Sequence, residues 1–251
     1  MLSVVVPAYN EGKHVYENLK IISEELSAFA GDFEIVVVND GSKDNTWDEV
    51  KRAVSEIKGV KDAGYEKNRG KGGAIIEGVK CANGDLIGFI DADLDLSPNH
   101  FKDFLEAMKR ENADCVIGSK MHKESKLEYP PARKLFSLCF YLMTKILFGL
   151  KVKDTQTGVK LFKAEYIKRV ASIQRVRGYA FDVEQLALIS RLKAKIIERP
   201  IVLEFKREET FGRIKFKDIW KMFTDTVGVW WNLRVRKNYD IGGEINGKQF
   251  K

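Results

Sequence analysis

The sequence has few cysteines and histidines, and this excludes several classes of site. Its three cysteines, Cys81, Cys115 and Cys139, are far apart and form no CxxC pair. We therefore expect neither a zinc site nor a disulfide scaffold, and a reducing compartment is the simpler assignment. The three histidines lie outside every motif described below. No Ser-His-Asp or Cys-His catalytic arrangement is expected.

Long hydrophobic runs are also missing. No stretch reaches about 18 apolar residues without a charge, and Lys145 interrupts the longest run, at 135–150. We therefore expect no membrane-spanning helix. The N-terminus lacks the basic and apolar regions of a secretory signal peptide. The sequence contains neither GxxxxGKS/T nor GxGxxG, which excludes a P-loop and the dinucleotide-binding fingerprint.

What is present is the composition of a folded α/β domain. The 251 residues are 44% hydrophobic, which supplies a core, and 31% charged. Lysine and arginine exceed aspartate and glutamate by 43 − 36 = 7. This basic balance favours anionic partners, namely nucleotides, phosphates, nucleic acid or anionic lipid, and does not choose among them.

Short apolar runs alternate with helical patterns in the first half. Apolarity on both faces predicts buried parallel strands at residues 3–7, 34–39, 86–90 and 115–118. Helices are expected at 11–29, 46–57, 73–81 and 98–110, the last with Ser97 as N-cap and Pro98 as its first residue. The alternation predicts a Rossmann-like, mostly parallel sheet flanked by helices.

The second half has a different pattern. It predicts an apolar helix at 134–150, a helix at 182–192 and a strand at 196–205. A long amphipathic segment follows at 214–236. The polar residues 238–251 are expected to form a frayed tail.

Polar and acidic residues follow each of the four predicted strands, and the carboxyl ends of parallel strands share one edge of a sheet. The densest group is Asp91-Ala92-Asp93-Leu94-Asp95. Three carboxylates so close repel one another unless a cation or solvent neutralises them. Asp91, Asp93 and Asp95 are therefore candidate ligands of Mg²⁺ or Mn²⁺, which would stabilise a diphosphate leaving group.

A second candidate phosphate contact lies in a glycine-rich, basic stretch. Residues 68–73 read NRGKGG and precede a predicted helix. Backbone N–H groups there, together with Lys71, could meet the phosphates of a nucleotide. A plain flexible turn is the alternative interpretation of this stretch.

Several segments together resemble family 2 glycosyltransferases of the GT-A fold, and more narrowly the dolichyl-phosphate glucose and mannose synthases. The segments are PAYNE (7–11), VVVNDGSKDNT (36–46), GKGGAI (70–75), DADLD (91–95), IGSK (117–120), DTQTGVKLF (154–162) and FDVEQL (181–186). The resemblance covers roughly residues 2–217. It implies a GT-A catalytic domain at 1–217, followed by an amphipathic helix and polar tail at 218–251.

The resemblance also implies roles for residues at the matching positions. Those that match the nucleotide-sugar site are Pro7, Tyr9, Glu11, Val38, Asp40, Asp91, Ala92 and Asp93. Those that match the acceptor-phosphate site are Lys120, Arg133 and Ser137. Gln156, with Asp154 and Thr157, matches a loop near the sugar. Arg213 and Lys215 resemble a loop that closes over the donor.

The chain departs from its relatives at two of these places. Lys120 stands where relatives usually have arginine, so a bidentate phosphate contact becomes a point charge. Ile214 takes the usual serine position of the closing loop. Both departures could alter affinity or acceptor choice.

The implied reaction is inverting transfer of a hexose to a lipid phosphate. A phosphate monoester has a second pKa of about 6 and is mostly ionised at neutral pH, so it needs no strong general base. Asp93, Lys120 and Arg133 are the expected catalytic residues. UDP-glucose and GDP-mannose both fit the motifs, and DTQTG with FDVE favours UDP-glucose modestly.

The lipid acceptor implies contact with a membrane surface. The apolar helix at 135–150 has basic flanks, and 216–236 is aromatic and basic, as in helices that lie in the bilayer interface. A cytoplasmic protein attached peripherally, or through a membrane-protein partner, is expected. The alternatives are a glycosyltransferase with a non-lipid sugar acceptor and a non-enzymatic nucleotide-binding module. Nucleic acid is not expected, because the acidic cluster opposes it electrostatically.

Overall fold

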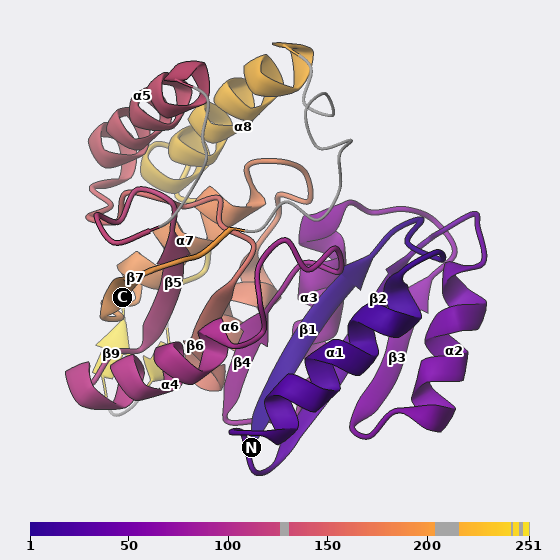
Figure 1. Cartoon of the computed structure of the whole chain (residues 1–251). Coiled ribbons are helices and arrows are strands. Elements are labelled where there is room, and N and C mark those ends of the chain that lie inside the picture. The colour runs from indigo at the N-terminus through magenta and orange to yellow at the C-terminus, as the bar shows by residue number, and fades with distance from the viewer. Residues whose placement is uncertain (126–130, 204–215, 242, 246–247, 251) are drawn as a thin grey trace.

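A seven-stranded sheet forms the centre of the computed structural model (Figure 1), which describes residues 1–125, 131–203, 216–241, 243–245 and 248–250. The strands lie in the order β3-β2-β1-β4-β6-β5-β7. Their bounds are β1 Leu2–Ala8, β2 Phe33–Asp40, β3 Val60–Tyr65, β4 Leu86–Phe89, β5 Cys115–Ser119, β6 Lys160–Lys163 and β7 Ile196–Pro200. All neighbours pair in parallel except β6, which is antiparallel to β4 and β5. The predicted mostly parallel α/β sheet is confirmed.

Helices cover both faces of this sheet and bury two separate core clusters. Helices α1 (Val15–Ser27) and α4 (His100–Glu111) lie on one face, with α2 (Thr46–Glu56) near the β3 edge. The other face carries α3 (Lys71–Cys81), α6 (Ala164–Ile173) and α7 (Phe181–Arg191). Helices α5 (Pro131–Phe148) and α8 (Phe216–Arg234) lie side by side beyond one end of the sheet (Figure 1), and Phe140 contacts Phe223 edge to face.

The four predicted buried strands are confirmed, each to within one residue at either end. Strands β3 and β6 were not predicted from the sequence. Strand β3 lies at the sheet edge and exposes Lys61 and Asp62, so it has no apolar run. Strand β6 is only four residues long. Strand β7 ends at Pro200, before the predicted end at 205.

Helices α1 and α4 begin later than expected, and the tail also differs from the expectation. Helix α1 begins at Val15 instead of residue 11, because residues 11–14 form a turn in which the His14 N–H donates to the Glu11 carbonyl at 2.9 Å. Helix α4 begins at His100 rather than Pro98, because the backbone after Ser97 first makes a tighter turn, in which the His100 N–H donates to the Ser97 carbonyl at 3.1 Å and the Phe101 N–H to the Pro98 carbonyl at 3.0 Å. Ser97 Oγ still accepts the Asn99 N–H at 3.1 Å, as an N-cap side chain does.

The tail is not frayed where it is described: Tyr239 is buried, and β8 (Gly243–Ile245) pairs with β9 (Lys248–Phe250). The domain boundary at 217 stays a prediction. No helix in the described part of the chain is both long and apolar enough to cross a bilayer.

Glu34 joins the amino ends of three strands, at the edge of the sheet opposite the predicted strand-end loops. Its buried carboxylate accepts hydrogen bonds from Ser3 Oγ at 2.6 Å and Asn83 N at 2.6 Å, and pairs with Lys61 Nζ at 2.7 Å. Burial alone would raise the pKa of Glu34, but these donors outweigh it and lower the pKa to about 2. Glu34 thus ties β2 to β1, to β3 and to the turn before β4.

We expect Glu34→Gln to lower the free energy of unfolding at pH 7 by about 2 kcal/mol, allowing for screening of the exposed Lys61 end. The folded-state pKa lies below the ordinary value of 4.5, so this contribution is present above that value and is lost as pH falls towards 2. The difference between variant and wild type should therefore shrink below about pH 4.5 in urea unfolding curves. Glu49→Gln, at an exposed helical ion pair with Arg52, is the matched control. A difference constant with pH would contradict the assignment.

Candidate active site

A cavity of about 640 Å³ opens at the carboxyl ends of β1, β2 and β4. It is where the strand-end loops were expected to converge. The predicted residues that line it are Pro7, Tyr9, Glu11, Asp40, Lys71, Asp91, Ala92 and Asp93. Val38 is fully buried in β2 and packs in the core instead. The volume lies within the range typical of small-molecule sites.

Asp40 organises one end of the cavity. Its buried carboxylate accepts hydrogen bonds from Tyr65 Oη at 2.7 Å and from Arg69 N at 2.8 Å. Asn68 Nδ2 donates to the Asp40 carbonyl at 3.1 Å. Burial and the Asp40 carboxylate raise the pKa of Tyr65, so its hydroxyl stays a donor. These bonds fix the loop that leads into α3 and to Lys71.

Lys71 and Asp91 form an ion pair at the centre of the cavity, with Nζ 2.5 Å from Oδ1. Burial alone would lower the pKa of Lys71, but Asp91 and Asp182 outweigh it and raise that pKa. Lys71 therefore remains a cation beside the acidic group. Such a cation, at the start of a helix, suits an anionic ligand.

Asp93 also lines the cavity, and its surroundings disfavour the ionised form of its carboxyl group. Burial raises its pKa to about 6, and the nearby charges of Asp91 and Asp95 add to the effect. Leu94, which lies between Asp93 and Asp95 in the sequence, has a positive φ of 54° and makes the turn that brings these two aspartates together. A carboxylate that is costly to ionise fits a cation bound beside it.

The three predicted metal ligands do not form a preassembled cluster. Within the ranges the structure describes, no group of three His, Cys, Asp or Glu side chains is placed to hold a metal ion. Asp91 and Asp93 could still supply two carboxylates, since Mg²⁺ and Mn²⁺ complete their shells with water and phosphate oxygens. Asp95 does not line the cavity.

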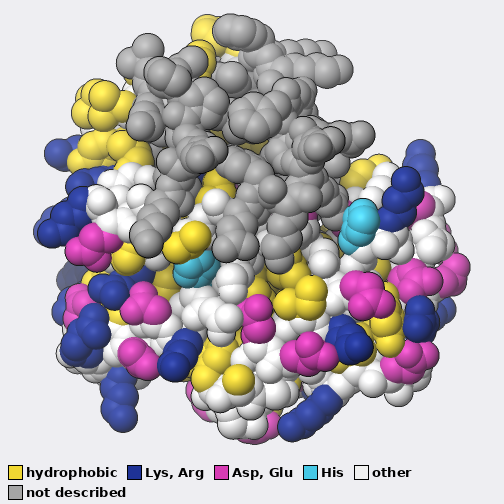
Figure 2. Space-filling view, in the orientation of Figure 1, with side chains coloured by type: hydrophobic (Ala, Val, Ile, Leu, Met, Phe, Trp, Pro, Cys, Tyr) yellow, Lys and Arg dark blue, Asp and Glu magenta, His cyan; other side chains and the backbone are white. Residues whose placement is uncertain are grey.

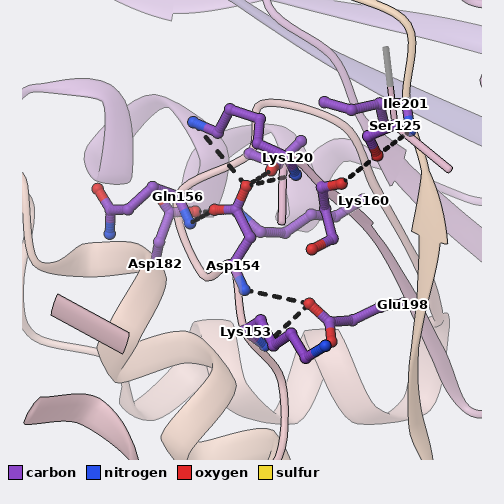
Figure 3. Close-up of polar contacts among 11 residues, drawn as sticks. Lys120, Ser125, Lys153, Asp154, Gln156, Lys160, Asp182, Glu198 and Ile201 are labelled. Carbon is purple, nitrogen blue, oxygen red and sulfur yellow. Dashed lines mark hydrogen bonds and ion pairs between the residues drawn. The ribbon is translucent and has the colours of Figure 1, made fainter. Parts of the chain in front are cut away.

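Lys120 is held at the end of β5 by a buried aspartate (Figure 3). Asp154 Oδ2 accepts the Lys120 N–H at 2.9 Å and lies 3.9 Å from Lys120 Nζ. It also accepts the Thr157 hydroxyl at 2.6 Å. Burial alone would raise the pKa of Asp154, but Lys120 and these donors keep it lowered. Asp154 is thus an anion that orients Lys120.

The remaining predicted acceptor and donor residues are described only in part. Arg133 belongs to α5, but its side chain lies outside the described residues. Ser137 is half-buried on the next turn of α5. Arg213 and Lys215, in the predicted closing loop, also lie outside the described residues.

The structure adds lining residues that were not assigned to the nucleotide-sugar site. They are Ala8, Arg177, Gly178, Tyr179, Phe181 and Asp182. Asn68 and Gly70, from the glycine-rich stretch, and Gln156, from the loop expected near the sugar, also line the cavity. Asp182 forms a buried ion pair with Lys160 at the start of β6, while burial raises its pKa. Gln156 Nε2 is buried and has no hydrogen-bond partner among the described residues. Phe181 and Asp182 belong to the FDVE motif, and Gln156 belongs to the DTQTG motif.

The sequence matches the model of glycosyl transferase family 2 over residues 3–171. A dolichyl-phosphate beta-glucosyltransferase of Trichomonas vaginalis is 33% identical, over 94% of this chain and 77% of the relative. The dolichol-phosphate mannosyltransferase of Pyrococcus furiosus is 31% identical, over 88% of this chain and 61% of its own length. The chain spans 38% of the glycosyltransferase AglD of Haloferax volcanii, at 26% identity.

Solved structures show the same fold. Glucosyl-3-phosphoglycerate synthase from Mycobacterium tuberculosis, crystallised with Mn²⁺, UDP and glucosyl-3-phosphoglycerate, superposes with a TM-score of 0.67. The match covers 92% of this chain and 79% of that one, at 17% identity. Fold, strand-end cavity and sequence match agree: the chain belongs to glycosyl transferase family 2.

Proposed function

We propose that the protein transfers glucose from UDP-glucose to a dolichyl or polyprenyl phosphate, with inversion at the anomeric carbon. The observation that carries this proposal is the cavity in which Lys71, Asp91 and Asp93 meet beside the Asp40 loop. It offers one end for a nucleoside and a charged centre for a diphosphate. The glucosyl assignment draws support from the Trichomonas relative, which matches nearly the whole chain.

The Asp40 end would receive the nucleoside. Pro7, Tyr9 and Glu11 line the cavity there, and Tyr9 is 43% exposed, so its ring is available to a ligand. Lys71 would contact the diphosphate. Gln156 and Asp182 line the cavity beyond the aspartates and would face the hexose.

The carboxylates of Asp91 and Asp93 would hold a divalent cation, Mg²⁺ or Mn²⁺. When bound, such a cation neutralises charge on the departing diphosphate. The raised pKa of Asp93 supports this assignment, because a nearby cation relieves the repulsion that raises it. The mycobacterial synthase that shares the fold was crystallised with Mn²⁺.

On the acceptor side, Lys120, Arg133 and Ser137 would hold the lipid phosphate. An oxygen of that phosphate attacks the anomeric carbon from the face opposite the diphosphate. The bond to the diphosphate breaks, and UDP leaves with the bonding electrons. The attacking oxygen is already ionised at neutral pH, so rate enhancement rests on positioning and charge stabilisation.

Helices α5 and α8 would meet the membrane surface. Leu138, Leu142 and Ile146 recur on one face of α5 and are 44%, 46% and 80% exposed. Trp220 and Trp231 are exposed on α8. Hydrophobic side chains gather at the upper left of Figure 2, where α5 lies in Figure 1. An apolar face with basic flanks suits a bilayer interface, and a membrane-protein partner is the other occupant.

We expect label from UDP-glucose to enter a short polyprenyl phosphate in detergent with Mg²⁺ or Mn²⁺, and EDTA to abolish it. The assay runs GDP-mannose in parallel and counts the organic phase. Label from GDP-mannose alone would replace the glucosyl assignment with a mannosyl one. No lipid product from either donor would refute the lipid-phosphate acceptor, and transfer to a soluble sugar would identify the alternative.

We expect Asp93→Asn to reduce turnover at least ~100-fold. The same change should raise the free energy of unfolding of the metal-free protein at pH 7 by about 1–2 kcal/mol. The raised pKa means that ionised Asp93 destabilises the folded protein as pH rises above 4, and asparagine carries no charge. The gain should vanish below about pH 4. Asp62→Asn, at an exposed position of β3, is the matched control. Near-wild-type turnover in Asp93→Asn would defeat the metal assignment.

Lys120→Met should raise the KM for the lipid phosphate about tenfold and leave the KM for the donor unchanged. The variant removes the cation that Asp154 orients and keeps the length of the side chain. Lys123→Met, at an exposed site on the same segment, controls for loss of positive charge. An equal effect of both substitutions would assign Lys120 to general attraction instead of phosphate contact.

A further inference from the structure

Glu184, in α7, has no part in the proposed reaction, yet its buried carboxylate accepts several hydrogen bonds. Its side chain is fully buried. Its oxygens accept the backbone N–H of Arg175 at 3.1 Å and that of Val176 at 2.8 Å. Both donors belong to the segment between α6 and α7. Glu184 therefore fixes the start of that segment against α7.

A further donor to Glu184 comes from beyond the end of α8. Tyr239 is buried, and its hydroxyl donates to Glu184 Oε1. Arg175 reaches the same place, with Nη2 2.6 Å from the Asn238 carbonyl and its guanidinium over the Tyr239 ring at 5.3 Å. Asn238 in turn donates to the Asn232 carbonyl in α8 at 3.1 Å. The end of α8 is thus tied to the α6–α7 segment.

The far end of the same segment forms part of the donor cavity. Arg177, Gly178 and Tyr179 line it. The Arg177 carbonyl accepts the Gly72 N–H at 3.1 Å, in the first turn of α3. A Cβ at Gly72 would lie 2.9 Å from that carbonyl, so the two backbones approach closely. Gly72 follows Lys71, the partner of Asp91.

We propose that Glu184 is a positioning residue for the donor site, and that Tyr239 completes it. Glu184 holds residues 175–179 against the start of α3, where Lys71 meets the cavity. The Tyr239 hydroxyl makes this arrangement depend on where α8 ends. The helix proposed to meet the membrane is thereby coupled to donor binding. The inference rests on the proposed nucleotide-sugar donor.

Tyr239→Phe tests the coupling because it removes one hydroxyl and keeps the ring. Tyr16→Phe is its matched control: Tyr16 also donates to a glutamate, Glu56, at 2.6 Å, and also lies under an arginine, Arg52, but far from the cavity. Binding of UDP with Mn²⁺ is measured by calorimetry on the full chain. The melting temperature and the donor KM and kcat are measured on the same preparations.

We expect Tyr239→Phe to weaken UDP binding and raise the donor KM about fivefold to tenfold, with kcat at saturating donor within about twofold of wild type. Tyr16→Phe should leave UDP binding unchanged. A purely structural role of Tyr239 would lower the melting temperature and leave the UDP affinity as in wild type. That result would overturn the proposal.

Arg175→Met provides a second variant should Tyr239→Phe fold poorly. It keeps an apolar stem but removes the contacts with Asn238 and the Tyr239 ring, and we expect a weaker loss of UDP affinity in the same direction. Unchanged affinity in a folded Arg175→Met protein would also contradict the coupling. A wild-type protein that binds no UDP would refute the proposed donor itself, so the two failures are distinguishable.

Discussion

Strand β6 runs against both of its neighbours, and the composition of the site depends on this reversal. Lys160, its first residue, pairs with Phe89 at the end of β4 and with Ile117 near the end of β5. The loop before β6 therefore lies at the carboxyl edge of the sheet, where the loops after the parallel strands also lie. A Cβ on Gly158 would come within 2.1 Å of Asp91 Oδ2, so this loop packs directly on the acidic group.

The reversal also distributes charge across the site. Three acids in or near the cavity have a lysine beside them, in the pairs Lys71–Asp91, Lys120–Asp154 and Lys160–Asp182. Two of the three pairs include a residue from β6 or the loop before it. Asp93 differs, since its pKa is raised by burial and by other carboxylates. The electrostatic demand for a cation is therefore concentrated at Asp93.

The sequence was sufficient for what depends on local pattern and insufficient for what depends on topology. Runs such as 34–39 predicted their strands, and parallel strand order then placed Asp40 and Asp91 at one edge. Lys160 reads as a lone charge in a short apolar segment, and only antiparallel insertion brings it to Asp182. The polar composition of residues 238–251 predicted a frayed tail, yet Tyr239 is buried there. Its burial depends on a hydrogen bond to the carboxylate of Glu184, which composition does not reveal.

The part of the chain that matches the family model ends at residue 171, before the cavity is complete. Arg177, Tyr179 and Asp182 close its wall from α7 and the segment before it. The part of the chain that matches the family model thus contains Asp40, Lys71, Asp91 and Asp93, while later residues build the wall beyond. This wall also reaches the Lys71–Asp91 pair, because Asp182 raises the pKa of Lys71 and the Arg177 carbonyl accepts the N–H of Gly72, the residue after Lys71. Residues 172–186, and α8, which packs against α7, are therefore the places to substitute when the proposed donor and acceptor are tested.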